Sequence, residues 1–312
     1  MINSVKNQIL IYGDAFIDYI ANDETNLTYT KFLGGATVNV AAGVSRLGAS
    51  CFFITVTGDD PASEFVRKRL REERVNLDYA VLVPNKRVSG VYIHLGETNE
   101  RIFHKYIDET PDIQVEYEDL TKAAFREASI FHFGSGTLFQ QTALETTQRA
   151  VELAVESDVL ISFDANIRPL RWKNEELCRE TIGSFLSKVD LLKLTEEELS
   201  FLTETKTIED GIRQLERYGI PVVLITVGAK GAYVVIDGIQ THVGVEAVEA
   251  VDTTGAGDAF IAGILRQIHL KGKPASCNEW IDYIAFGNKL GALCATKQGA
   301  LSALPYLEEI DE

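Results

Sequence analysis

The chain has 312 residues, of which 46% are hydrophobic and 24% charged, and its formal net charge at pH 7 is −16. This composition is ordinary for a globular protein with a sizeable core, and the negative charge argues against a general nucleic-acid or anionic-membrane surface. The chain shows no signal-peptide or bilayer-spanning run and no C-x-x-C pair. We therefore expect a cytoplasmic protein with no nucleic-acid or membrane partner.

Short apolar runs alternate with amphipathic ones along most of the chain. The pattern predicts a strand over residues 8–14, a helix over 36–48 that ends at Gly48, and a strand over 51–60. Further strands are predicted in ASIFHFG, DVLISFDAN, VDLLKLT and PVVLITVG, with helical patterns between them. This alternation predicts an α/β fold, a Rossmann-like three-layer α/β/α sandwich with a mostly parallel sheet.

Two segments break the alternation. Residues 19–33 are polar and lack helical periodicity, and residues 88–107 resemble two short strands around a GETNE turn. We interpret both as a small β-sheet lid over the C-terminal edge of the main sheet; a pair of ordinary surface hairpins is the alternative. No linker or internal repeat divides the chain, so residues 1–312 are predicted to form one domain with this lid.

Polar and glycine-rich clusters follow the first strand and open the first helix. In open α/β sheets ligands collect at the carboxyl ends of the strands. Asp14 and Asp18 lie four apart in the loop that leaves the first strand, where they could hold a polyol. Gly34 and Gly35 allow close backbone approach, and Asn39 offers both a donor and an acceptor. Taken singly, these residues are also explained as turn acids, loop glycines and a helix-terminal amide.

The stretch AVDTTGAGDAFIAGIL, residues 250–265, carries the most specific signal. Gly255, Ala256 and Gly257 lead into an apolar helix, and their backbone N–H groups and the helix dipole suit a phosphoryl group. Asp258 follows in the first turn, where it could accept a proton from an attacking hydroxyl. The alternative is a helix cap with a tight glycine turn.

Together these clusters resemble the ribokinase-like (PfkB-type) carbohydrate kinase family over nearly the whole chain, and the fructokinases most. FLGGATVNVAAGVSRLG matches the N-terminal signature of the family, and DTTGAGDAFIAG matches the C-terminal one. The resemblance implies a kinase that transfers the γ-phosphoryl group of ATP to a primary hydroxyl of a small sugar. It makes Asp258 the catalytic base and Gly255, Ala256 and Gly257 the anion hole.

The resemblance also implies a nucleotide site. DLLKLTEEEL is similar to the family's segment near the ATP phosphates and Mg²⁺, with Thr195 in place of the usual asparagine. TVGAKGAYV resembles the nucleotide loop, and FGNKLGALCATKQGA resembles the helix beside the adenine. The residues that this similarity places at ATP are Lys193, Glu198, Thr226, Gly228, Gly231 and Asn288, with Glu198 acting on Mg²⁺ indirectly.

A monovalent-cation site is implied as well. Asp252 and the backbone of Thr254 match the family's cation loop, so K⁺ is expected beside ATP and Mg²⁺; a solvated acid that caps the turn is the alternative for Asp252. Lid sheets can pair across a two-fold axis, which would cover their edge strands. A homodimer through the lid is therefore expected.

The expected acceptor is fructose, because FDANIRPLRW and HFGSGTL look most like fructokinase segments. Arg168 could reach the sugar or the ATP phosphates, or form a surface salt bridge. The lid residues Arg101, His104 and Lys105 could contact the acceptor, and their positive charge would suit an acidic sugar. The alternatives are a 2-keto-3-deoxygluconate kinase, a ribokinase or nucleoside kinase of the same family, and a non-catalytic sugar- or nucleotide-binding regulator on the kinase fold.

Overall fold

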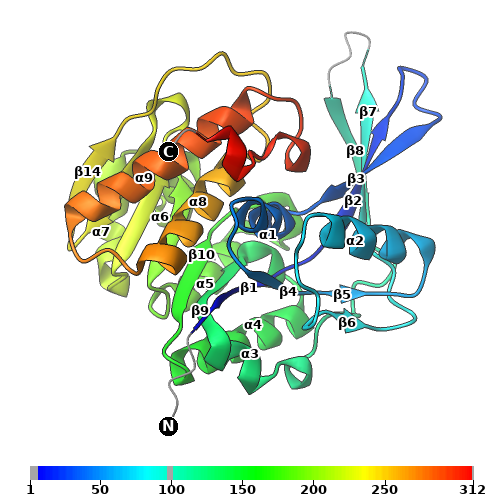
Figure 1. Ribbon diagram of the computed structural model, residues 1–312, viewed down its shortest axis with the longest axis horizontal. Coiled ribbons are helices and arrows are strands. Elements are labelled where there is room, and N and C mark those ends of the chain that lie inside the picture. Colours follow the sequence, from blue (N-terminus) through cyan, green and yellow to red (C-terminus); the bar gives the residue numbers. More distant parts are fainter. Residues whose placement is uncertain (1–5, 97–100, 311–312) are drawn as a thin grey trace.

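The computed structural model describes residues 6–96 and 101–310. The centre of this part is an eight-stranded sheet with the order β14-β13-β12-β11-β10-β9-β1-β4 (Figure 1). The strands from β12 to β4 are parallel, whereas β13 is antiparallel to both of its neighbours. The strands are β1 (Gln8–Tyr12), β4 (Cys51–Ile54), β9 (Ala128–Gly134), β10 (Leu160–Asp164), β11 (Leu191–Thr195), β12 (Val222–Thr226), β13 (Ala232–Ile236) and β14 (Ile239–Val243).

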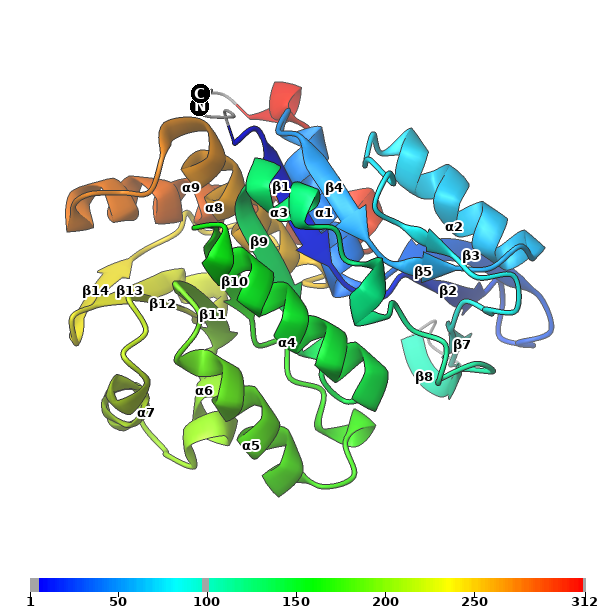
Figure 2. The same cartoon turned by 90° about the horizontal axis from the view of Figure 1, so that it is seen from below.

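Helices cover both faces of the main sheet (Figure 2). Ile9 and Ile11 of β1 join one buried cluster with α1, α8 and α9, and Leu10 and Tyr12 join another with α4 and α5. Strands buried on both faces need continuous apolar runs, and the predicted sandwich is confirmed. The helices are α1 (Ala36–Arg46), α2 (Pro61–Glu72), α3 (Lys122–Glu127), α4 (Gln141–Glu156), α5 (Glu175–Leu186), α6 (Glu196–Thr203), α7 (Ile208–Leu215), α8 (Ala256–Lys271) and α9 (Cys277–Ala295). Across residues 6–96 and 101–310, no helix has both the length and the apolar character that a bilayer crossing requires.

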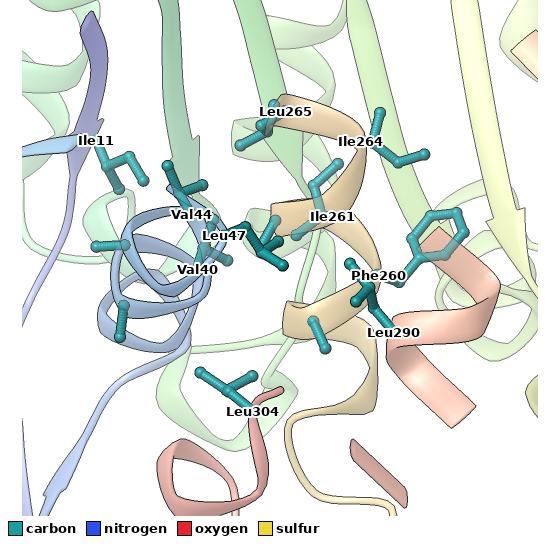
Figure 3. Packing of buried hydrophobic residues seen from close by; sticks show 14 of the residues in the cluster. Ile11, Val40, Val44, Leu47, Phe260, Ile261, Ile264, Leu265, Leu290 and Leu304 are labelled. Atoms are coloured by element: carbon teal, nitrogen blue, oxygen red, sulfur yellow. The ribbon is translucent and has the colours of Figure 1, made fainter. Parts of the chain in front are cut away.

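Close packing of α1 against α8 sets the geometry of the candidate site (Figure 3). Val40 and Val44 of α1 and Ile261 of α8 are buried in the same cluster. A Cβ at Gly43 would lie 2.8 Å from the Cβ of Ala262, which is too close for a native contact, so a larger residue would push the helices apart. Small residues on both helices therefore bring their N-terminal turns together.

Four strands form a separate sheet, here called the small sheet, with the order β3-β2-β7-β8. It projects from the main body beside α2 (Figure 1). The prediction of a second, small sheet in these two segments is confirmed, although residues 97–100 of the predicted GETNE turn lie outside the described residues. The strands are β2 (Phe16–Ala21), β3 (Tyr29–Gly34), β7 (Gly90–Leu95) and β8 (Arg101–Ile107).

The small sheet begins earlier than predicted, which changes the place of Asp18. Asp18 was predicted in a loop, but it lies in β2, opposite Phe32 of β3 and Val91 of β7. The strand forms because Ile17 and Ala21 alternate with more exposed positions and are buried. Gly34, predicted in a loop, is likewise the last residue of β3.

Three predicted element ends are wrong by two or more residues. The first strand ends at Tyr12 because the chain then turns into the small sheet, and the helix at 36–48 ends at Arg46. The strand predicted over 51–60 stops at Ile54, and Val56–Thr57 (β5) pairs with a different strand, Val81–Leu82 (β6). Apolar periodicity alone does not show where a strand leaves one sheet for another.

Candidate active site

Asp258 lies in the first turn of α8, beside the N-terminal half of α1. Nδ2 of Asn39 donates a hydrogen bond of 2.8 Å to Oδ2 of Asp258, across 219 positions of the chain. This bond fixes the orientation of the carboxylate. Within the described residues Oδ1 of Asn39 is buried without a hydrogen-bond partner, which leaves an acceptor for a ligand hydroxyl. Asn39, predicted to bind the acceptor, thus also holds the predicted base.

The surroundings of Asp258 make it a stronger base than an ordinary aspartate. Its pKa is raised to about 7: burial and the nearby Asp164 carboxylate raise the pKa, and they outweigh the Asn39 hydrogen bond and the charges of Lys193 and Arg168, which lower it. A general base works best when its pKa lies near the working pH. The position therefore suits proton removal from a hydroxyl at neutral pH.

Backbone N–H groups at the start of α8, here called the N–H cradle, lie beside the Asp258 side chain. Gly255 is the N-cap of α8 with φ of +82°, and a Cβ there would lie 2.9 Å from Cα of Ala300, so glycine is required. The Ala256 N–H, which was predicted to face the phosphoryl group, instead donates to the Thr253 carbonyl at 3.2 Å. The following N–H groups of the first turn have no partner within the helix and suit an anion.

Lys193 adds a full positive charge beside this cradle. A Cβ at Gly257 would lie 3.0 Å from Nζ of Lys193, and the same Nζ lies 3.1 and 3.0 Å from the two carboxylate oxygens of Asp164. Both side chains are buried. Burial lowers the pKa of Lys193, but the carboxylates of Asp164, Glu198 and Asp258 raise it above the ordinary value, so Lys193 is charged.

Glu198, predicted near Mg²⁺, joins two segments of the site. Its Oε1 accepts from the Ile167 N–H at 2.7 Å and its Oε2 accepts from the Thr195 N–H at 2.8 Å. Thr195 Oγ1 in turn accepts from the Glu198 N–H at 3.1 Å, which completes a capping box at the start of α6. Thr195 therefore does the capping that an asparagine would also do.

The residues predicted to bind the acceptor gather where β1, β2 and β3 lead into α1. A Cβ at Gly34 would lie 2.7 Å from Oδ2 of Asp18. Gly35 has φ of +122°, and a Cβ there would lie 2.7 Å from the Asp14 carbonyl oxygen, so only glycine suits this position. Burial raises the pKa of Asp14, while the charges of Arg171 and Lys86 lower it. The structure thus brings both acids to the same end of α1.

Two of the three lid residues predicted to contact the acceptor, His104 and Lys105, lie on the face of the small sheet opposite Asp18. Asp18 is paired with Val91, so the neighbouring Tyr92 points to the opposite face of the small sheet. Nζ of Lys105 lies 5.0 Å from the centre of the Tyr92 ring, and the His104 ring stacks on His94 at 3.9 Å. These two side chains therefore point away from Asp18. The side chain of Arg101 is not among those described.

The exposed turn after β10 contains Arg168, which was predicted from the sequence. Two further residues of this region, Asp164 and Arg171, were not predicted. Arg168, predicted to bind sugar or phosphate, donates from Nη1 to the Ile167 carbonyl at 3.1 Å. Asp164, the partner of Lys193, ends β10 and was missed, as was Arg171 of the 3₁₀ turn Pro169–Arg171. Both stand in FDANIRPLRW, where an acid directly after an apolar strand is the signal that could have found Asp164.

The predicted nucleotide loop follows β12. Thr226 ends β12 beside Thr195 of β11, and Gly228 has φ of +59°. A Cβ at Gly231 would lie 2.2 Å from the Val243 carbonyl oxygen. Nδ2 of Asn288 donates to that same oxygen at 2.9 Å. The Asn288 amide, expected near the adenine, thus holds the backbone that packs on this loop.

Asp252 anchors the segment before the cradle. Its Oδ1 accepts from N and Oγ1 of Thr254 at 3.0 and 2.6 Å, and its Oδ2 accepts from the Gly299 N–H at 2.9 Å. These bonds are what a turn-capping acid makes, and they hold the Thr254 backbone in place. No three His, Cys, Asp or Glu side chains in residues 6–96 and 101–310 are grouped to hold a metal ion.

The chain is similar to known proteins over nearly its whole length. The chain is 34% identical over 307 residues to the fructokinase of Klebsiella pneumoniae (98% of this chain, 99% of the relative) and 31% identical over 311 residues to fructokinase-1 of Oryza sativa subsp. japonica (97% and 96%). A double-mutant fructokinase from Vibrio cholerae O395, in its fructose, ADP and potassium ion bound form, matches with a TM-score of 0.85 and 31% identity over 97% of this chain and 96% of that one. The family described as pfkB family carbohydrate kinase matches residues 6–307, and the chain belongs to this family of sugar kinases.

Proposed function

We propose that this sugar kinase phosphorylates fructose at a primary hydroxyl with ATP. The observation that carries the proposal is the 2.8 Å contact between Asn39 and Asp258 at the mouth of the N–H cradle. It joins the N-terminal acceptor region to the C-terminal phosphoryl region, as a transfer between two substrates requires. The named fructokinases among the relatives support fructose as the acceptor.

The described residues support a direct transfer. Asp14 and Asp18 would accept hydrogen bonds from the sugar hydroxyls, and Asp258 would take the proton of the attacking hydroxyl. The hydroxyl oxygen then bonds to the γ-phosphorus as the bond to the ADP oxygen breaks, so ADP leaves and the proton stays on Asp258. The N–H cradle, with Lys193 beside it, stabilises the charge on the phosphoryl group.

Mg²⁺ and K⁺ are the proposed ions. Glu198 already accepts two backbone N–H groups, but each carboxylate oxygen keeps a lone pair that suits a water of hydrated Mg²⁺. When bound, Mg²⁺ neutralises phosphate charge. The Asp252 turn, which fixes the Thr254 backbone, offers the oxygen ligands that suit K⁺. Relatives of known structure hold ADP with potassium or calcium.

We further propose one domain, with the small sheet as a lid, and a homodimer through that sheet. Phe32, Ile102 and Phe103 of the small sheet are 42%, 48% and 65% exposed. A second copy would cover these apolar side chains and the edge strands. The dimer would also keep water from the phosphoryl group when the sheet closes.

A coupled assay of ADP release tests the acceptor. We expect the highest kcat/KM with fructose, lower values with ribose, 2-keto-3-deoxygluconate, tagatose 6-phosphate and adenosine, and slow hydrolysis of ATP alone. Activity with only the nucleoside or the phosphosugar would contradict the proposed acceptor, and fast hydrolysis without any acceptor would contradict closure over the site.

The pH dependence should report on Asp258. Because its pKa is raised to about 7 and the base must be unprotonated, kcat/KM is expected to fall as the pH drops through about 7, by tenfold per unit well below it. Replacing Asn39 by alanine removes a hydrogen bond that lowers this pKa, so the acid limb should move to higher pH. A profile from pH 5 to 9 with no inflection above 5 would show that Asp258 does not control the rate.

A further inference from the structure

Arg171 connects the small sheet to the main body. The central carbon of its guanidinium lies 4.4 Å from the ring centre of Tyr106 in β8 and 4.0 Å from that of Phe139, which precedes α4. Nη2 of Arg171 also donates a 2.8 Å hydrogen bond to the Tyr106 hydroxyl. A planar cation between two rings with a directed bond to one of them has a fixed orientation.

The Tyr106 end of this contact lies on the acceptor side of the small sheet. Tyr106 pairs with Val91 of β7, and Val91 pairs with Asp18 of β2, so the three residues lie across one face. The Arg171 guanidinium also affects Asp14, the second acid predicted to bind the acceptor. Burial raises the pKa of Asp14, and Arg171 is the charged group that lowers it most. Arg171 thus acts on the charge of Asp14 and contacts, through Tyr106, the face of the small sheet that carries Asp18.

Most N–H groups of the Arg171 guanidinium are available to a ligand. The guanidinium carries five N–H groups, and the one hydrogen bond it makes within residues 6–96 and 101–310 goes to Tyr106. Asp14 and Asp18, as carboxylates, only accept hydrogen bonds. A polyol offers both donors and acceptors on each hydroxyl, so the unused N–H groups of Arg171 and the two carboxylates would together complement it.

We propose that Arg171 is a positioning residue for the sugar acceptor. Its contact with Tyr106, here called the clasp, holds the small sheet in the position that brings Asp18 toward Asp14. The inference rests on the proposed sugar kinase function. It explains why an arginine on an otherwise exposed turn is sandwiched between a ring of the small sheet and a ring of the main body. Loss of the clasp should weaken binding of the acceptor more than binding of ATP, because the predicted nucleotide loop follows β12 and lies away from the small sheet.

The chain contains a matched control. Nη2 of Arg217 donates to the Tyr218 hydroxyl at 2.9 Å, and its guanidinium carbon lies 4.8 Å from that ring. This pair precedes β12, at the opposite end of the strands from the site. Arg217→Leu therefore removes an equivalent arginine–tyrosine contact without touching the small sheet.

The test compares Arg171→Leu, Arg171→Lys and Arg217→Leu by steady-state kinetics. We expect Arg171→Leu to raise the KM for fructose about 10- to 100-fold, with the KM for ATP and kcat changed less than about threefold. Arg171→Lys keeps the charge but not the planar fork and should recover part of the loss. Arg217→Leu should match the wild type. A fructose KM for Arg171→Leu within about twofold of the wild type, or an equal rise in Arg217→Leu, would overturn the proposal.

A second measurement does not depend on turnover. Without ligands, amide hydrogen exchange over 102–107 should be faster in Arg171→Leu and Tyr106→Phe than in the wild type and in Arg217→Leu, because the sheet is no longer tied down. Unchanged exchange in both variants would refute the clasp. If the wild type phosphorylates no sugar, the proposed function fails, whereas the exchange result still decides whether Arg171 holds the small sheet.

Discussion

Asp258→Asn is expected to lower kcat by roughly 10²–10⁴-fold while the Kd for fructose changes only a few-fold, because a positioned base contributes about that much to proton transfer. The substitution preserves shape: the new side-chain oxygen can still accept the 2.8 Å hydrogen bond from Asn39. What is lost is the ability to take up a proton. The measurement pairs kcat from the ADP-release assay with fructose affinity from calorimetry.

Asp282→Asn is the control for this result. Asp282 is an exposed acid of α9, so the same chemical change there should leave kcat unaltered. If Asp258→Asn also turned over at the wild-type rate, Asp258 would not be the base. The chain would then fit the alternative of a sugar- or nucleotide-binding regulator on the kinase fold.

The sequence allowed the main architecture and the order of the site segments to be predicted, for a physical reason. Strands buried on both faces are continuous apolar runs. An anion site at the start of a helix, as around Gly255, needs small residues followed by a helical pattern, independently of the rest of the chain. These are local requirements. They can be recognised without knowing which segments meet in space.

The contacts between distant segments could not be predicted in this way. The bond from Asn39 to Asp258 depends on α1 packing closely on α8, which the pattern of apolar residues does not specify. Asp18 was expected in a loop because a single alternating strand with an acid in it resembles a polar turn. Arg171 lies in the FDANIRPLRW segment, yet its proposed role depends on where β8 places Tyr106.

The pair of Lys193 and Asp164 gives the largest expected effect on stability. Lys193→Met should lower the free energy of unfolding by about 3–5 kcal/mol, because it leaves the Asp164 carboxylate buried without its partner. It should also lower kcat, since the Lys193 ammonium lies beside Gly257 of the cradle and adds a full positive charge there. Urea unfolding measures the first effect, and the ADP-release assay measures the second.

The double variant Lys193→Met, Asp164→Asn separates these two roles. An asparagine removes the unpaired charge and can still accept the Asn166 N–H that Asp164 Oδ1 accepts at 3.2 Å, so most of the lost stability should return. The kcat should stay low, because no cation has been restored beside the phosphoryl group. Recovery of kcat together with stability would mean that Lys193 serves only to neutralise Asp164, and the electrostatic part of the cradle would then consist of the backbone N–H groups and the helix dipole alone.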